Sequence, residues 1–406
     1  MVKNQTNYMP IIISGCMLVL LSFGYRAGFG LFMQPMSEAR GWGRDVLALA
    51  FAIQNLAWGV FAIIAGGLVD KYGNLKVLFA GVLCYAAGMY SMALSTSELS
   101  IISTAGLLVG AGIAGTSFGI VLPAFARAVP KEKQGWALGV GTAAGSIGQF
   151  LVVPLIQTAV EMLGWFQALQ YLGLSAFIMF LFVLPLAKYG GPNEEEESKA
   201  HISILEVVGN AFRIKSYVLL VFGFYVCGFH LAFITVHMPA YLVDLGLSAN
   251  VGAWSISLIG LCNVAGAYYA GVLSTNRSKR KLLAAIYVSR AIAITCFLAL
   301  PISIPSVVIF SAAMGFLWLA TIPPTSGLVS HFFGVRYMAL LYGIVFFSHQ
   351  VGSFTGVWLG GWLYETYGNY DGVWLAGILL GLIAAGLHWK IDEKDYSDRL
   401  VCRFAV

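Results

Sequence analysis

Ionisable side chains stand inside long apolar runs of the sequence, among them Arg26, His230, Arg290 and His349. Arg26 lies in the stretch SFGYRAGFGLF, in the middle of the apolar run 10–36. An arginine at the centre of a bilayer costs roughly 2.5–3.5 kcal/mol on insertion scales. A guanidinium fork matches a carboxylate, and a histidine can take up a proton near neutral pH. These residue types therefore predict a site for an organic anion.

The carboxylates have the opposite distribution. All 18 aspartates and glutamates lie in predicted loops, in tails or in the terminal turns of apolar runs, for example Asp70, Glu161, Asp244 and Glu365. The apolar interior is therefore predicted to be cationic, without a counter-ion of its own. The sequence also shows no Ser-His-Asp order and no metal-ligand spacing, so we expect no enzyme, no cofactor and no metal site.

Apolar runs that are long enough to cross a membrane must position these side chains. The chain has 406 residues, of which 59% are hydrophobic and 10% charged, and its mean hydropathy is +0.83. A membrane span needs about 20 mostly apolar residues. Twelve such runs occur, at 10–36, 45–69, 77–96, 101–126, 136–160, 165–187, 216–243, 250–273, 282–301, 306–332, 338–364 and 373–390.

Basic residues predict the orientation of these spans. With the N-terminus inside, all 23 lysines and arginines except Arg26, Arg40, Arg44 and Arg290 fall in inner loops or tails. The positive-inside rule then predicts that both termini are cytoplasmic. We expect a multi-pass protein of a bacterial inner membrane, whose basic loops face anionic membrane lipid and do not bind nucleic acid.

The sequence repeats itself at a constant offset. FGYRAGFGLFMQPM (23–36) aligns with CGFHLAFITVHMPA (227–240), and this register pairs Arg26 with His230. We therefore predict an all-α membrane protein of twelve transmembrane helices in two pseudo-symmetric six-helix bundles, as in transporters built from parallel repeats. The predicted units are an N-terminal bundle (1–187), a cytoplasmic linker with a short amphipathic helix (188–215), a C-terminal bundle (216–390) and a cytoplasmic tail (391–406).

The stretch GGLVDKYGNLK after the second run resembles the signature of the major facilitator superfamily, through Gly66, Asp70, Lys71 and Gly73. Together with the twelve spans and the repeat, this resemblance covers the whole chain and implies the major facilitator fold. It also implies that these four residues form a cytoplasmic gate, in which Asp70 contacts a basic residue after the fourth span. Arg127 is the candidate for that residue.

In finer detail the chain is similar to the branch of monocarboxylate porters and oxalate/formate exchangers. Arg26 stands where the porters carry a lysine in span one, and His349 where the exchangers carry a lysine in span eleven. Span eight departs from the porters, because Asn263 replaces their aspartate and Ala267 their arginine. Asn263 cannot titrate, so the proton mechanism of the porters does not transfer directly to this chain.

The expected substrate site combines the four ionisable residues with polar and aromatic neighbours on other spans. We expect Arg26 and His349 to contact the anion, and His230 to join them through its pairing with Arg26. Arg290 lies well inside span nine, and the sequence leaves open whether it is a ligand or a buried structural residue. The further candidates are Gln54, Trp58, Tyr25 and Asn263.

These observations predict a secondary active transporter of small organic anions, above all monocarboxylates, that works by alternating access. Proton symport and exchange against a counter-anion both remain open as coupling schemes. The alternatives are an efflux transporter for drugs or neutral metabolites, and a membrane sensor or assembly factor that retains a transporter fold. We expect the protein to act as a monomer.

Overall fold

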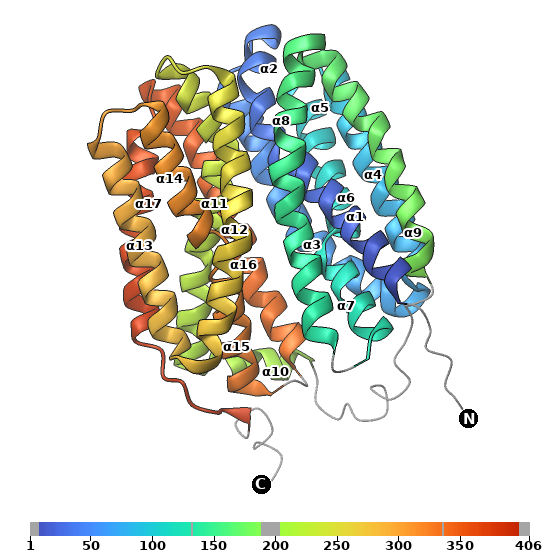
Figure 1. Cartoon of the computed structure of the whole chain (residues 1–406), viewed down its shortest axis with the longest axis vertical. Coiled ribbons are helices and arrows are strands. Elements are labelled where there is room, and N and C mark those ends of the chain that lie inside the picture. The colour runs from blue at the N-terminus through green and yellow to red at the C-terminus, as the bar shows by residue number, and fades with distance from the viewer. Residues whose placement is uncertain (1–7, 131–132, 188–203, 335–336, 398–406) are drawn as a thin grey trace.

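The computed structural model describes residues 8–130, 133–187, 204–334 and 337–397. Every regular element within these residues is a helix. Figure 1 shows two helical bundles that stand side by side, one built from the first half of the chain and one from the second. The predicted fold class is confirmed.

The first bundle contains the spans predicted between residues 10 and 187, and three of them are made of more than one helical piece. Its elements are α1 (Met9–Ala27), η1 (Phe29–Phe32), α2 (Met33–Arg40), α3 (Arg44–Tyr72), α4 (Asn74–Leu94), α5 (Glu98–Ile101), η2 (Ile102–Leu108), α6 (Val109–Thr116), α7 (Phe118–Ala128), α8 (Gln134–Ser175), η4 (Ala176–Met179) and α9 (Phe180–Leu186).

The second bundle has the same plan and is preceded by a short helix. Its elements are α10 (Ile204–Phe212), α11 (Lys215–Asp244), α12 (Ala249–Asn276), α13 (Lys279–Ala299), α14 (Ile304–Leu317), α15 (Ile322–Phe333), α16 (Met338–Tyr367) and α17 (Asp371–Trp389). Helix α10 lies within the predicted linker. Residues 188–203 of that linker and 398–406 of the predicted tail lie outside the described residues.

Eleven helical stretches in the described part of the chain are long and apolar enough to span a membrane, one fewer than the twelve predicted runs. The difference arises at Trp136–Leu186, a stretch of 51 residues that contains both the fifth and the sixth predicted run. Gly164 stands between these runs with φ 77°, a conformation that residues with a side chain rarely adopt. In Figure 1 the chain follows α8 to one end of the molecule, turns there and returns toward α9.

The two bundles meet mainly through α3 against α16 and through α8 against α12. Side chains hydrogen-bond to backbone across the second of these contacts: Gln149 Nε2 donates to Ile256 O (2.8 Å), and Ser257 Oγ donates to Phe150 O (2.6 Å). Such contacts require the backbones to approach closely, and small or polar residues at helix interfaces permit this in membranes.

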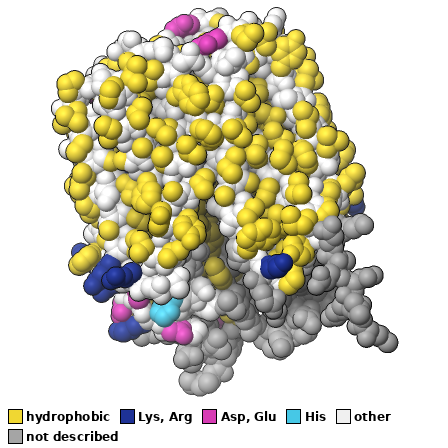
Figure 2. Space-filling model, in the orientation of Figure 1, with side chains coloured by type: hydrophobic (Ala, Val, Ile, Leu, Met, Phe, Trp, Pro, Cys, Tyr) yellow, Lys and Arg dark blue, Asp and Glu magenta, His cyan; other side chains and the backbone are white. Residues whose placement is uncertain are grey.

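We call the end of the molecule where α2 ends at Arg40 and α3 begins at Arg44 the far end. Helix α1 begins, and helix α17 ends, at the opposite end of the molecule. Figure 2 shows hydrophobic side chains over most of one face, with the charged side chains gathered toward its two ends. This is the distribution that a lipid environment favours.

Candidate functional site

Arg26 lies in the last turn of α1, and its guanidinium has few partners. Nη2 donates to Asn55 Oδ1 (2.8 Å), and the guanidinium carbon lies 5.0 Å from the ring centroid of Trp58. The residue is half-buried. Within the described chain this is the one hydrogen bond of the guanidinium, and no carboxylate pairs with it. Most of its N–H donors are therefore available to a ligand.

Asn55 orients the Arg26 side chain. Its Nδ2 donates to Phe51 O (2.8 Å), one turn earlier in α3, so that its Oδ1 faces the guanidinium. Asn55 is only 3% exposed. A buried amide that is held at both ends in this way fixes the direction of the Arg26 fork, and directed donors are what recognise a carboxylate.

Trp58, one turn after Gln54 on α3, connects the arginine to the second bundle. Its Nε1 donates to Ser117 Oγ (3.3 Å) in the first bundle. Its ring packs edge to face with that of Phe346 of α16, with the centroids 5.4 Å apart. Phe346 in turn stacks on His349, with centroids 5.7 Å apart and an interplanar angle of 9°. Two rings thus link Arg26 in one bundle to His349 in the other.

His349 is buried on α16 between aromatic rings. Its Nδ1 donates to Gln350 Oε1 (3.2 Å), and Ser353 Oγ lies 3.5 Å away. The ring of Phe224 of α11 lies 5.3 Å from the imidazole. The structure therefore places His349 near the contact between the two bundles, and its role in a substrate site stays a prediction.

Arg290 and His230 lie inside the second bundle. Arg290 has no exposed surface, and its Nε and Nη2 donate to Leu317 O (3.3 and 2.7 Å). Its Nη2 also donates to Trp318 O. His230 Nε2 donates to Gly377 O of α17 (2.7 Å). Both side chains thus serve backbone carbonyls within their own bundle.

Two more predicted residues turn into the first bundle. Gln54 Nε2 donates to Ala105 O (2.7 Å) in the irregular helix η2, and the Tyr25 hydroxyl bonds Ser175 Oγ (2.9 Å). Each is almost fully buried, at 3% and 5% exposed. Their hydrogen bonds join helices of the first bundle, so neither side chain is directed toward the guanidinium of Arg26.

Asn263 stands between the bundles and uses both ends of its amide. Its Nδ2 donates to Ser146 Oγ of α8 (2.7 Å), and its Oδ1 accepts from Leu319 N (2.9 Å). Leu319 lies between α14 and α15, where span ten is interrupted. Asn263 therefore connects the first bundle to this interruption in the second.

The predicted gate residues gather at the end of the molecule opposite the far end. Gly73 ends α3 with φ 80°, and its N–H donates to Val69 O (2.8 Å). The Lys71 ammonium lies 5.1 Å from the ring centroid of Tyr72, while Gly66 has open space where a side chain would project. Arg127 lies in the last turn of α7.

The central contact of that gate stays a prediction. The side chain of Asp70 lies outside the described part of the structure, so its distance from Arg127 is not established. The backbone nevertheless places both residues at the ends of helices on the same side of the first bundle.

The comparison with protein-family models agrees with this architecture. The model of the Major Facilitator Superfamily matches residues 15–338 and 238–400, which is most of the chain. The chain belongs to the major facilitator superfamily. It is therefore a transporter and not an enzyme, and it is a multi-pass membrane protein that carries a small molecule.

Relatives of this facilitator are distant in sequence. The uncharacterized MFS-type transporter YcxA of Bacillus subtilis is 25% identical over 370 residues, 89% of each chain. Monocarboxylate transporter 12 of Rattus norvegicus is 23% identical and covers 72% of this chain and 66% of its own. The cyanate transport protein CynX of Escherichia coli is 23% identical and covers 71% of this chain and 73% of its own.

Solved structures share the facilitator fold. A D-xylose–proton symporter superposes with a TM-score of 0.75 at 16% identity, over 95% of this chain and 99% of the other. A bacterial homologue of the lysosomal transporter Spinster, in an inward-facing conformation, superposes with a TM-score of 0.75 at 11% identity, over 93% and 95% of the two chains. At these identities the likeness establishes the fold alone.

An ion-pair network that sequence reasoning did not assemble joins the two bundles at the far end. Arg44, the first residue of α3, forms a two-pronged ion pair with Asp244, the last residue of α11, at 2.5 and 2.7 Å. Its Nη1 also donates to the Tyr370 hydroxyl (3.2 Å), its backbone N–H to Glu365 (3.3 Å), and its guanidinium covers the ring of Tyr364. The sequence placed Arg44, Asp244 and Glu365 only in outer loops or terminal turns, because pairing across 200 residues has no local signal.

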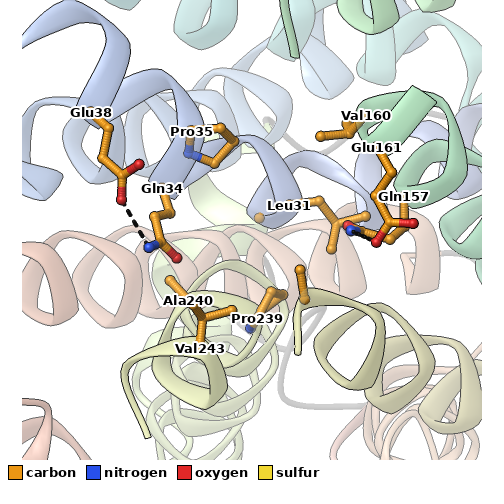
Figure 3. Close-up of a pocket in the computed structure, with 12 residues that line it drawn as sticks. Leu31, Gln34, Pro35, Glu38, Gln157, Val160, Glu161, Pro239, Ala240 and Val243 are labelled. Atoms are coloured by element: carbon orange, nitrogen blue, oxygen red, sulfur yellow. Dashed lines mark hydrogen bonds between the residues drawn. The ribbon is translucent and has the colours of Figure 1, made fainter. Parts of the chain in front are cut away.

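A cavity of about 260 Å³ also opens toward the far end, between the first bundle and α11. In Figure 3, Gln34 bonds Glu38 on one side of it, and Gln157 bonds Glu161 on the other. None of the predicted site residues lines this cavity. Its carboxylates are already paired with amides, so it differs in chemistry from the cationic site around Arg26.

Proposed function

We propose that this facilitator carries small organic anions, monocarboxylates above all, by alternating access around a site between its two bundles. The observation that carries the proposal is the state of Arg26. It is a half-buried cation near the middle of a span, held in direction by Asn55 and paired with no carboxylate among the described residues. A permanent charge at that depth is costly, and a bound carboxylate offsets the cost.

Arg290 supplies the contrast that gives this observation its meaning. Both arginines lie inside apolar spans, but Arg290 is fully buried, and two of its three side-chain nitrogens, Nε and Nη2, donate to carbonyls where α14 ends. Arg290 therefore satisfies carbonyl groups that the end of helix α14 leaves unpaired. Arg26 has no such structural acceptors apart from Asn55, so we assign substrate binding to Arg26 and a structural role to Arg290.

His349 is the second group that we assign to the anion. It faces the bundle contact from α16, and only Trp58 and Phe346 separate it from Arg26 along the ring contacts. In its protonated form it adds a second positive charge to the site. Loading the anion together with that proton gives symport, whereas a site that closes only when an anion is bound gives exchange.

Two of the named relatives support a small anion as the cargo. One is named a monocarboxylate transporter and another a cyanate transport protein, and both names describe small anions. Their sequence identity to this chain is low, so their names support the class of substrate only. The positions of Arg26 and His349 are the independent support from this chain.

We further propose that the chain lies in a bacterial inner membrane with both termini in the cytoplasm. The end with Gly66, Asp70, Lys71, Gly73 and Arg127 then forms the cytoplasmic gate. The far end, where Arg44 pairs with Asp244, then faces outward and is closed in this structure. The protein is proposed to work as a monomer, because each chain contains both bundles around its own site.

The test is ligand-dependent melting of the purified full chain in detergent. A ligand at about 100 times its dissociation constant stabilises the folded state by roughly 2.7 kcal/mol. We expect small carboxylates to raise the melting temperature of the native chain, and Arg26→Gln to abolish the shift. Arg26→Lys is the matched control, because it keeps the charge but loses the two-pronged fork, and it should retain part of the shift.

Two results would contradict the proposal. A panel of mono-, di- and hydroxycarboxylates that leaves the melting temperature unchanged would remove the anion assignment. Stabilisation by lipophilic cations or neutral compounds, undiminished in Arg26→Gln, would instead favour an efflux transporter and make Arg26 structural.

A further inference from the structure

A continuous row of aromatic rings crosses the contact between the bundles beside Arg26. It runs from α7 through α1 and α3 in the first bundle to α16 and α11 in the second. The centroid distances along it are 4.3 Å (Phe118–Phe23), 5.8 Å (Phe23–Trp58), 5.4 Å (Trp58–Phe346), 5.7 Å (Phe346–His349) and 5.3 Å (His349–Phe224).

Arg26 lies against the middle of this row. Its guanidinium carbon is 5.0 Å from the ring centroid of Trp58, the last ring of the row in the first bundle. Phe346, the next ring, belongs to the second bundle and is only partly buried. A carboxylate bound to Arg26 would therefore place the atoms attached to it beside aromatic surface.

The polar side-chain nitrogens of Trp58 and Asn55, which lie beside Arg26, are already paired within the protein. Trp58 Nε1 donates to Ser117 Oγ (3.3 Å), and Asn55 Nδ2 donates to Phe51 O (2.8 Å). Hydroxyl groups on a substrate would have to compete with these bonds, and a polar group buried without a partner weakens binding. A flat apolar group would instead gain contact with ring faces and edges.

We propose that the substrate is a carboxylate with a flat apolar body, such as an aryl carboxylate, held by Arg26 at its charge and by Trp58 and Phe346 along its body. This inference rests on the proposed function and narrows it. Trp58 and Phe346 belong to different bundles and already touch, with centroids 5.4 Å apart, so a substrate body that lies along both rings stabilises this contact between the bundles. Formate, oxalate and lactate have no such body.

The experiment compares matched ligands on the purified full chain by titrating the melting temperature. Benzoate and acetate carry the same charge and differ in the ring. Cyclohexanecarboxylate has a body of similar size that is not flat, and benzamide has the ring without the charge. We expect benzoate to half-saturate the shift at a concentration about tenfold below acetate, which corresponds to about 1.4 kcal/mol.

Substitutions of Trp58 and Phe346 separate effects on ligand binding from effects on folding. Trp58→Ala should remove most of the preference for benzoate over acetate, and Trp58→Phe should keep most of it. Because the Trp58 ring lies against the Arg26 guanidinium, the measured quantity is the ratio of the two half-saturating concentrations in each variant. Phe346→Leu should reduce the preference in the same direction, because it removes the ring from the second bundle. The melting temperature without ligand shows whether each variant is folded.

The outcomes distinguish this inference from the function on which it rests. If formate, acetate or lactate bind as tightly as benzoate and lose binding in Arg26→Gln, the proposal of a flat apolar substrate body is wrong, but the proposed anion site at Arg26 stands. If no carboxylate binds in an Arg26-dependent way, both fail. If benzamide binds as tightly as benzoate, the aryl carboxylate is wrong because the charge plays no part.

Discussion

Arg26 and Arg290 have the same side chain and both lie within apolar spans, yet their partners give them different roles. Arg290 donates from Nε and Nη2 to the carbonyls of Leu317 and Trp318, while Arg26 meets a single amide oxygen from Asn55. An unpaired guanidinium in a span is costly and implies a partner that comes and goes. This contrast leads directly to a prediction about Asn55.

Asn55→Asp should block anion binding. The substitution places a carboxylate at the position of the Asn55 amide oxygen, 2.8 Å from Arg26 Nη2, where it becomes a permanent counter-ion. A substrate carboxylate must then displace an ion pair inside the protein, which is unfavourable at low dielectric. We expect the ligand-induced shift to disappear. The melting temperature without ligand then measures whether the new ion pair offsets the lost hydrogen bond to Phe51 O.

Asn55→Ala is the matched control for that variant. It removes the bond that directs Arg26 but adds no charge, so binding should weaken only several-fold. Equal loss of binding in the alanine and aspartate variants would show that Asn55 acts by packing alone. Full binding by Asn55→Asp would show that Arg26 is not the anion contact.

Residues on apolar helices also show what the sequence could and could not predict. Hydropathy and the repeat predicted the spans and the depth of Arg26, His230 and His349, because span length follows from membrane thickness. They did not predict which way each side chain faces. A helix that is apolar all round carries no sign of its inner face, so His230, placed at the depth of Arg26, points at Gly377 within its own bundle.

The interruption between α14 and α15 could also be predicted only in part from the sequence. The break between α14 and α15 is held from two sides, since Arg290 donates to carbonyls at the end of α14 and Asn263 accepts from Leu319 N. Pro323 and Pro324, in the first turn of α15, explain why the chain breaks there. Which side chains would serve the freed groups depended on tertiary contacts that the sequence does not show.

Arg290→Met should therefore destabilise the protein and spare the binding site. The change leaves the carbonyls of Leu317 and Trp318 without their donor, at roughly 1–3 kcal/mol for each buried group left unpaired. We expect a lower melting temperature without ligand, but the same preference among carboxylates at temperatures where the variant is folded. Loss of carboxylate binding in a folded Arg290→Met variant would return Arg290 to the substrate site.

Glu393, which follows the last helix α17, forms hydrogen bonds with the start of α13. Glu393 accepts hydrogen bonds from the Ser278 hydroxyl (2.6 Å) and from the backbone N–H of Arg280 (2.8 Å). Partial burial raises the pKa of Glu393, but these hydrogen bonds lower it by more, so the pKa lies below its ordinary value of 4.5. The carboxylate also suits the positive end of the helix.

Glu393→Gln should loosen the segment after α17. Because the pKa of Glu393 is lowered in the folded chain, the stabilisation is present above pH 4.5 and is lost as the pH falls through the folded-state value. Limited trypsin digestion at neutral pH should cleave after Lys394 faster in Glu393→Gln than in the native chain. The native chain should lose the same protection once the pH falls below the folded-state pKa of Glu393, which a pH-tolerant protease can measure. Equal protection in both chains at neutral pH would contradict the assignment.

The two ends of the molecule differ in how the bundles are joined. At the far end a single residue, Arg44, contacts Asp244, Glu365, Tyr364 and Tyr370 of the other bundle. Arg44 is 8% exposed, so water screens this network less than an ordinary surface pair. An alternating-access cycle has to separate the bundles at this end, and this network must break when it does.

Asp244→Asn should shift the protein toward a state that is open at the far end. The variant keeps the shape but loses the charge that pairs with Arg44, and a hydrogen bond to a charged group contributes roughly 1.5–3 kcal/mol. The balance between closed and open states should move by roughly 10–100-fold. Hydrogen–deuterium exchange of the intact chain in detergent should rise at the start of α3 and at the end of α11.

Asp371→Asn is the control for that experiment, because Asp371 is an exposed acid at the same end, in the first turn of α17. It should leave exchange at both segments unchanged. The double variant Arg44→Asp with Asp244→Arg restores the pair in reverse but loses the contact with Tyr364 and adds a charge beside Glu365, so it should recover only part of the protection. Exchange in Asp244→Asn that matches the native chain would mean that helix packing, and not the ion pair, holds the far end closed.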